Sequence, residues 1–229
     1  MDFRFNDEQQ LWHDTVNAFM EREVGVEYIR KHDEAREFPE EAYRKIAERG
    51  WLGLLISEEF GGLEADPVMY AIFCEAIAKY SLDFAAAIMT SMFTATNIAN
   101  HGTAEQREKY LPAFLAGDLK FSISITEPNA GSDAAGLRTK AIRDGDSWII
   151  NGNKTFCSGA HLPNTVIAVM ARTGEDKHKG LSMILVPNTT DGVDVRKLDT
   201  IVRRSLGTTE IFLTDARVPA ENIIGQPGD

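Results

Sequence analysis

The chain has 229 residues, 43% of them apolar, and a formal net charge of −11 with no long basic run. This acidic balance argues against nucleic acid as a partner, and no uncharged apolar stretch approaches the roughly 20 residues of a membrane span. The first 20 residues carry four acidic side chains and so resemble neither a secretory signal nor a transit peptide, which favours a cytoplasmic globular protein.

Residues 1–118 carry helical periodicity with recognisable helix boundaries. Asn6 and Thr103 are each followed three positions later by glutamine, a pattern that predicts the start of a helix. Pro112 is expected to end the helix after Thr103 at about Leu111, because proline lacks the amide donor and its ring clashes one turn back. The first 118 residues are therefore predicted to form an all-helical domain.

From about residue 119 the apolar pattern changes from helical to alternating. Strands are expected at residues 141–143, 148–150, 165–170, 181–186, 193–197 and 210–213. Two dipeptides, Asp144-Gly145 and Asn151-Gly152, are strong signals for tight hairpins. Because helices and strands are segregated along the chain, we predict an α+β fold in which residues 119–229 form a small antiparallel β-barrel or sandwich domain that ends in a linker.

The stretch FSISITEPNAGSD, residues 121–133, joins a short alternating strand to a compact turn. The turn is built on Pro128 and Gly131 and is expected to present the hydroxyl groups of Thr126 and Ser132. Neutral donors held rigidly fit an uncharged cofactor ring with several acceptors. From composition alone, an ordinary strand-to-strand turn is the alternative.

Other common site patterns are missing from the sequence. It has no glycine-rich dinucleotide loop, no phosphate loop and no HExxH pair, and its five histidines lack ligand spacing. Cys74 and Cys157 have no metal-ligand neighbours and are expected to be packed, reduced thiols. The sequence therefore predicts no metal site and no nucleophilic triad.

Several stretches, in order along the chain, resemble the signatures of acyl-CoA dehydrogenases. The strongest are ITEPNAGSD at residues 125–133 and IINGNKTFCSG at residues 149–159. Further likeness lies in EEFGG at 58–62, GTAEQ at 102–106, YLP at 110–112 and VPAENIIG at 218–225. The resemblance implies a helical N-terminal domain and a middle β-domain, followed in the family by a C-terminal four-helix domain, with FAD bound between the last two.

The resemblance implies nine cofactor-binding residues: Ile123, Ser124, Ile125, Thr126, Gly131, Ser132, Phe156, Cys157 and Ser158. Thr126 would hydrogen-bond the flavin ring, and Ser132 would lie where cofactor and acyl-CoA substrate come close. Phe156 would pack beside the ring, and the Ser158 hydroxyl would reach its edge near N5. The family tripeptide at 156–158 is typically Trp-Ile-Thr, so this chain loses an indole donor and a methyl group. Ile123 replaces a commonly aromatic residue.

The resemblance also implies a reaction. Family members remove the α-proton of an acyl-CoA with a glutamate, pass the β-hydride to the flavin, and send electrons to electron-transfer flavoprotein. Because that glutamate lies in the C-terminal domain of most members, no catalytic residue is assigned, and the chain is expected to stop before that domain and turn over little alone. A homo-oligomer is expected at full length. Residues 80–98, including Met89, Met92 and Phe93, are expected to line part of the acyl cavity.

Two other hypotheses stay open at this point. One is a non-catalytic or split-subunit module that completes a flavin and acyl-CoA site with a separate helical chain. The other is a relative with a different flavin reaction, such as an oxidase or monooxygenase. The sequence does not distinguish acyl chain lengths.

Overall fold

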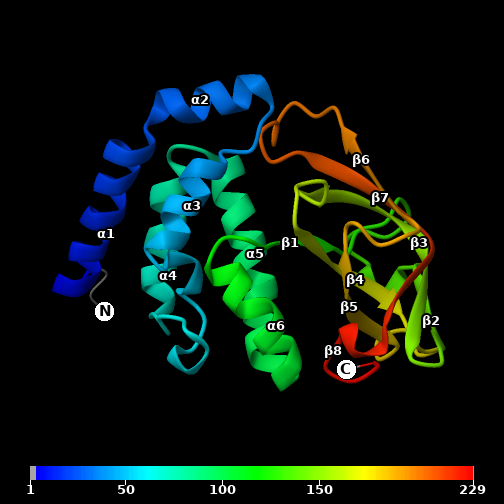
Figure 1. Ribbon diagram of the computed structural model, residues 1–229. Helices are drawn as coiled ribbons and strands as arrows, with labels where there is room; N and C mark the ends of the chain where they lie inside the picture. The colour runs from blue at the N-terminus through cyan, green and yellow to red at the C-terminus, as the bar shows by residue number, and fades with distance from the viewer. Residues whose placement is uncertain (1–3, 229) are drawn as a thin grey trace.

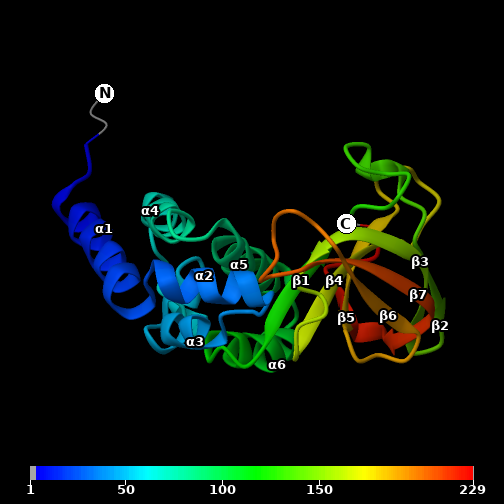
Figure 2. The ribbon, with the colours of Figure 1, turned by 90° about the horizontal axis from the view of Figure 1, so that it is seen from above.

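The computed structural model describes residues 4–228 and shows a helical region beside a sheet region (Figure 1). The helices are α1 (Asp7–Phe19), α2 (Val26–Ala35), α3 (Glu40–Glu48), α4 (Pro67–Ala78), α5 (Leu82–His101) and α6 (Ala104–Leu115). Seen from above, α1 lies at the end of the molecule far from the sheet, whereas α5 and α6 lie next to the sheet (Figure 2). The expected order of helices and then strands is confirmed.

Both predicted capping boxes are present. Asn6 Oδ1 accepts a hydrogen bond from the Gln9 amide at 2.8 Å, and Thr103 Oγ1 accepts one from the Gln106 amide at 3.2 Å. In each case the glutamine side chain accepts from the cap residue's own amide. These bonds satisfy amides that have no partner inside the helix, and so they fix where α1 and α6 begin.

The prediction that Pro112 ends its helix was wrong, because α6 continues through it to Leu115. The amide that proline lacks would bond the carbonyl of Glu108 one turn earlier. Glu108 and Pro112 are both exposed, so water can satisfy that carbonyl. The chain leaves the helix at Gly117, whose φ of 78° favours glycine.

The helical region packs around aromatic side chains. The Trp51 ring lies 5.1 Å from Trp12 and 5.0 Å from Phe19, in edge-to-face contacts. Phe73, which is fully buried, also meets Trp51 edge to face, with the ring centroids 6.0 Å apart. The same core continues through Phe121 into the sheet, so one apolar cluster joins the helices to the strands.

The strands form one mostly antiparallel sheet. They are β1 (Lys120–Ser124), β2 (Lys140–Asp144), β3 (Ser147–Ser158), β4 (Thr165–Arg172), β5 (Leu181–Pro187), β6 (Val193–Leu198), β7 (Thr208–Pro219) and β8 (Ile223–Ile224). Neighbours run in the order β6-β7-β3-β2-β4-β5-β8, and β1 pairs with β4. The sheet is therefore not a closed barrel, although the α+β class is as predicted. β1 and β4 are parallel, with Lys120 opposite Thr165.

One of the two predicted hairpins is confirmed. Asp144 lies opposite Ser147 across a turn in which Gly145 has a φ of 58°. Residues Asn151 and Gly152 instead lie inside β3 at an irregularity in its pairing with β7. A Cβ at Gly152 would lie 2.3 Å from Thr139 Oγ1, so this glycine serves a close approach rather than a turn.

A second apolar cluster fills the sheet region, with Ile150, Ile167, Ile184 and Ile211 fully buried. Both cysteines are free thiols, as expected, with Cys157 buried and Cys74 half-buried. Among residues 4–228, no helix is long and apolar enough to cross a membrane.

Candidate functional site

The turn after β1 is compact and is closed by backbone hydrogen bonds in both directions. Glu127 and Ala130 exchange two backbone hydrogen bonds, of 2.9 and 3.1 Å, which leave Pro128 and Asn129 as its exposed tip. Thr126 is half-buried just before the turn, and Ser132 is exposed after it together with Gly131. The turn thus presents both predicted hydroxyl groups where a ligand can reach them.

The end of β1 lies beside the end of β3. The Thr155 amide donates to Thr126 O at 2.9 Å, and Ser122 Oγ donates to Ser158 O at 2.8 Å. These two bonds hold Thr126 and the tripeptide at 156–158 at one edge of the sheet. We call this edge, residues 122–126 with 154–158, the β1–β3 edge.

A β-bulge shapes the β3 side of this edge. Lys154 pairs with Ile211 and Cys157 with Thr209, so two residues of β3 face one residue of β7. Phe156 sits in the bulge with a φ of 59°, a conformation that a bulky residue rarely adopts. The residue is 66% exposed, so the strained backbone turns a large apolar side chain toward solvent. Such strain is characteristic of functional sites.

Not every predicted residue presents its side chain to the outside. Ser124 and Cys157 are fully buried, and Ser124 Oγ lies 3.2 Å from Cys157 Sγ. Because this burial covers the main chain as well as the side chain, neither residue presents surface to a ligand. Ile125 is 39% exposed, and Ile123 is half-buried, so these two isoleucines can offer apolar contact.

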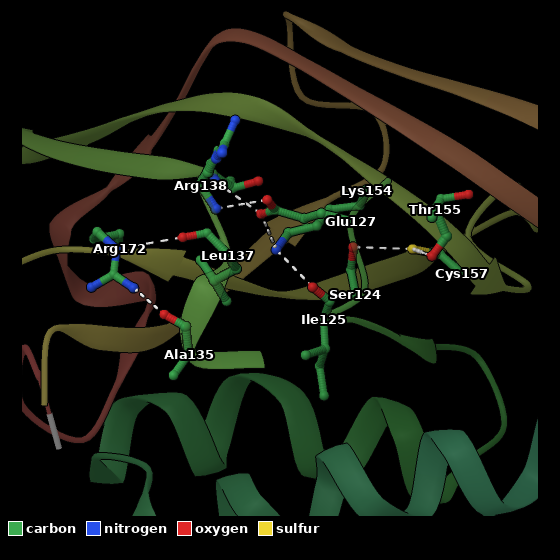
Figure 3. Close-up of polar contacts among 11 residues, drawn as sticks. Ser124, Ile125, Glu127, Ala135, Leu137, Arg138, Lys154, Thr155, Cys157 and Arg172 are labelled. Atoms are coloured by element: carbon green, nitrogen blue, oxygen red, sulfur yellow. Dashed lines mark hydrogen bonds and ion pairs between the residues drawn. The ribbon is translucent and has the colours of Figure 1, made fainter. Parts of the chain in front are cut away.

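A buried ion pair joins the two sides of the β1–β3 edge (Figure 3). Lys154 Nζ lies 2.9 Å from Glu127 Oε1 and donates a second bond, of 3.0 Å, to Ile125 O. The Glu127 carboxylate also accepts from the amides of Arg138 at 2.6 Å and Thr139 at 2.8 Å. The lysine and glutamate side chains are 0% and 3% exposed. The pair therefore fixes the strand end that precedes Thr126.

The electrostatics of Glu127 follow from these donors. Burial acts to raise the pKa of its carboxyl, but the hydrogen bonds from Arg138, Thr139 and Lys154 outweigh burial and hold the pKa below its usual value. Glu127 is thus a charged acceptor whose lone pairs are used inside the protein. This geometry fits a structural carboxylate rather than a proton acceptor for a substrate.

Arg172 organises the loop that follows the turn. Its guanidinium donates to Ala135 O at 2.8 Å and to Leu137 O at 3.4 Å (Figure 3). It also donates to Asp176 O at 2.8 Å, in the loop between β4 and β5. One arginine therefore ties two loops together and holds the chain beyond Ser132 in place.

A second arginine reaches the edge from the loop between β6 and β7. Arg203 Nη1 donates to Ser158 Oγ at 2.6 Å. Neither this contact nor the Lys154–Glu127 pair was predicted from the sequence. Lys154 and Glu127 are charged residues within stretches of mostly apolar and hydroxyl residues, and this was the signal that could have pointed to a buried pair. Nothing in the sequence pointed Arg203 toward Ser158.

The remaining predicted residues lie on α5. Met92 is buried in the helical core, Met89 is partly buried, and Phe93 is 45% exposed. Within residues 4–228, no group of three or more histidine, cysteine or acidic side chains is arranged to hold a metal ion.

The comparison with family models divides the chain in two. Residues 6–118 match the acyl-CoA dehydrogenase N-terminal domain, and residues 122–216 match the acyl-CoA dehydrogenase middle domain. The second match contains the whole β1–β3 edge.

Individual relatives agree with these models. The probable acyl-CoA dehydrogenase YngJ of Bacillus subtilis is 36% identical over 99% of this chain and 60% of its own length. The mouse mitochondrial long-chain specific acyl-CoA dehydrogenase is 34% identical over 97% of this chain and 52% of its own. The chain thus spans between about half and three fifths of these relatives.

Solved structures give the same result. The acyl-CoA dehydrogenase of Geobacillus kaustophilus superposes with a TM-score of 0.91 at 31% identity, over 100% of this chain and 60% of that one. A glutaryl-coenzyme A dehydrogenase in complex with glutaryl-CoA gives 0.92 at 32% identity, over 100% of this chain and 59% of that one. Sequence, fold and family models agree, and the chain belongs to the acyl-CoA dehydrogenase family.

Proposed function

We propose that this chain forms the flavin-contacting part of an acyl-CoA dehydrogenase, an oxidoreductase that desaturates the α,β bond of an acyl-CoA thioester. The observation that carries the proposal is the β1–β3 edge, where Phe156 is exposed on strained backbone. It lies two residues before Ser158 and next to Thr155, whose amide donates to Thr126 O. The family is flavin-dependent, and a Mycobacterium smegmatis glutaryl-CoA dehydrogenase, 26% identical to this chain, was determined in complex with FADH2.

The residues of the edge fit a flavin. When bound, FAD supplies the hydride acceptor, and the protein supplies orientation and exclusion of water. Thr126 and Ser158 offer hydroxyl groups to an uncharged, hydrogen-bonding ring edge, and Phe156 offers a flat apolar face. Gly131 and Ser132, exposed just after the turn, complete the surface together with the half-buried Ile123 and the exposed Ile125. Ser124 and Cys157 lie beneath this surface, where their side chains contact each other and support it.

The substrate and the electron acceptor are inferred from relatives. Ser132 lies beyond the turn, where we place the approach of cofactor and acyl-CoA, and Met89 and Phe93 on α5 are proposed to border the acyl group. A relative that is 32% identical is subunit CarC of the caffeyl-CoA reductase–Etf complex of Acetobacterium woodii. We accordingly propose electron-transfer flavoprotein as the partner, a cytoplasmic location and a homo-oligomeric whole enzyme with a domain division near residue 118.

The catalytic base is proposed to lie outside residues 4–228. The buried acidic side chains in that range are Asp83 and Glu127, and both are engaged. Asp83 accepts from the Ser205 amide and hydroxyl at 3.3 Å, and Glu127 is held by Lys154 and two amides. A chain of these residues alone is therefore expected to bind FAD with little or no turnover.

A test is the visible spectrum of the purified 229-residue protein after incubation with FAD and gel filtration. We expect a flavin band to elute with the protein. Phe156→Ala and Thr126→Val should each weaken that retention, whereas Asn6→Ala at the far end of the molecule should not. A wild-type protein that elutes without flavin, or a chain that turns over acyl-CoA at the rate of full-length relatives, would contradict the proposal.

A further inference from the structure

Arg203 uses its charge in an unusual way. It lies in the loop between β6 and β7, where it has a φ of 60° and its carbonyl accepts from the Gly207 amide at 2.7 Å. Its half-buried side chain crosses to the β1–β3 edge and donates to Ser158 Oγ at 2.6 Å. A cation is thus held against a neutral hydroxyl group at the proposed flavin edge.

Neighbouring arginines are paired differently. Arg204 lies 3.7 Å from the Asp33 carboxylate, and Arg36 lies 2.8 Å from the Asp199 carboxylate, so both connect this loop to the helical region. Within the described part of the chain, Arg203 has no carboxylate within ion-pair distance. Its charge is therefore not neutralised by the protein, and it remains available to something bound at the edge.

The contact also fixes the direction of the Ser158 hydroxyl. A guanidinium only donates hydrogen bonds, so Ser158 Oγ must accept from Arg203, and its own proton must point to another acceptor. The Ser158 carbonyl already accepts from Ser122. The bond from a charged donor is a strong one, and it leaves the hydroxyl poised to donate outward.

We infer, on the basis of the proposed function, that Arg203 is a positioning residue of the flavin site. It turns Ser158 into a hydrogen-bond donor toward the flavin ring and places a positive charge behind that hydroxyl group. In the proposed reaction the β C–H bond of the substrate breaks and both its electrons pass with the hydrogen to the ring, while the α-proton goes to the base. Hydride transfer thus adds one negative charge to the ring, and a nearby cation stabilises this charge.

The test measures the two-electron reduction potential of protein-bound FAD in the full chain, by equilibration with a reference dye. Arg203→Gln and Arg203→Met remove the charge, and Arg203→Lys keeps it. We expect both charge-removing variants to shift the potential negative by about 30 mV, which corresponds to a tenfold weaker preference for reduced flavin. Arg203→Lys should stay close to the wild-type potential.

The matched control is Arg204→Met, one residue along the loop, which removes a charge that Asp33 already pairs. It should change thermal stability without moving the flavin potential. Wild-type potentials in both Arg203→Gln and Arg203→Met, with FAD retained, would overturn the inference while leaving the proposed function intact. If the wild-type protein retains no FAD, the proposed function fails and the inference fails with it. If Arg203 only anchors its loop, these variants would lose stability while the flavin potential stays at the wild-type value.

Discussion

The helical region and the β1–β3 edge follow opposite rules of burial. In the helical region Phe73 and Tyr43 are fully buried, and the core is almost entirely apolar. At the edge, Lys154 and Ser124 are fully buried, and Phe156 is mostly exposed. A folded chain tolerates such an inversion where a ligand or a network compensates for it. The contrast indicates that the helices are shaped by packing, and it is what the proposed flavin contact of the edge would require.

The largest expected effect comes from breaking the buried ion pair. Lys154→Met leaves the Glu127 carboxylate buried without its cation, which costs about 3–5 kcal/mol of unfolding free energy. This loss would equal that of Phe73→Ala, the matched deletion in the apolar core, at about 3–5 kcal/mol. Urea denaturation followed by circular dichroism measures both.

The control is the double variant Lys154→Met with Glu127→Leu, which removes both charges. Replacement of a buried pair by apolar residues is often close to neutral, so the double variant should recover most of the lost stability. A double variant as unstable as Lys154→Met alone would show that the packing of Lys154, rather than its charge, matters at this position.

The stability that Glu127 contributes through the same ion pair should depend on pH in the acid range. The folded-state pKa of Glu127 lies below its usual value of 4.5, so the charged carboxylate stabilises the fold above that pH. As the pH falls from about 4.5 through the lower folded-state pKa, the stabilisation is lost. The difference in unfolding free energy between wild type and Glu127→Gln should therefore shrink with acid. A difference that stays constant between about pH 6 and pH 3 would contradict the lowered pKa.

The sequence predicted the helical region better than the edge. Capping at Asn6 and Thr103 depends on neighbours three residues away, so local pattern was sufficient. Pro112 and Gly152 were misinterpreted because each depends on its surroundings. An exposed carbonyl tolerates the proline, and a close approach by Thr139 requires the glycine.

At the candidate site, family signatures located the residues but not their contacts. The signature stretches assigned Thr126, Phe156 and Ser158 to one flavin site, and in the structure hydrogen bonds join the two segments that carry them. The contact between Arg203 and Ser158 joins residues that are 45 positions apart in the sequence. One lies in the loop between β6 and β7, and the other lies at the end of β3. Such a contact depends on the register of β6, β7 and β3, which no local pattern determines.

The variant Asn6→Ala, with an expected effect of moderate size, tests whether stability and flavin binding are separable. Asn6→Ala removes the side-chain cap of α1, which lies far from the sheet (Figure 2). The expected loss is about 1 kcal/mol of unfolding free energy, with FAD retention unchanged. Thermal unfolding and gel filtration with FAD measure the two quantities on one preparation. A parallel loss of flavin would mean that the two regions do not behave independently.

The smallest expected change in stability lies at Phe156, and its sign is informative. Phe156→Gly removes a side chain from a left-handed position, where a non-glycine residue costs about 1 kcal/mol or more. Because the ring is mostly exposed, little burial is lost, and the variant should be as stable as wild type or up to about 1 kcal/mol more stable. Phe156→Ala removes the same ring but keeps the strain, so it should gain nothing. Both variants should retain less FAD, which would show that the strain at this bulge is maintained for binding. If Phe156→Gly instead destabilises the fold and leaves flavin retention intact, the exposed ring serves packing, and the contrast between the two regions disappears.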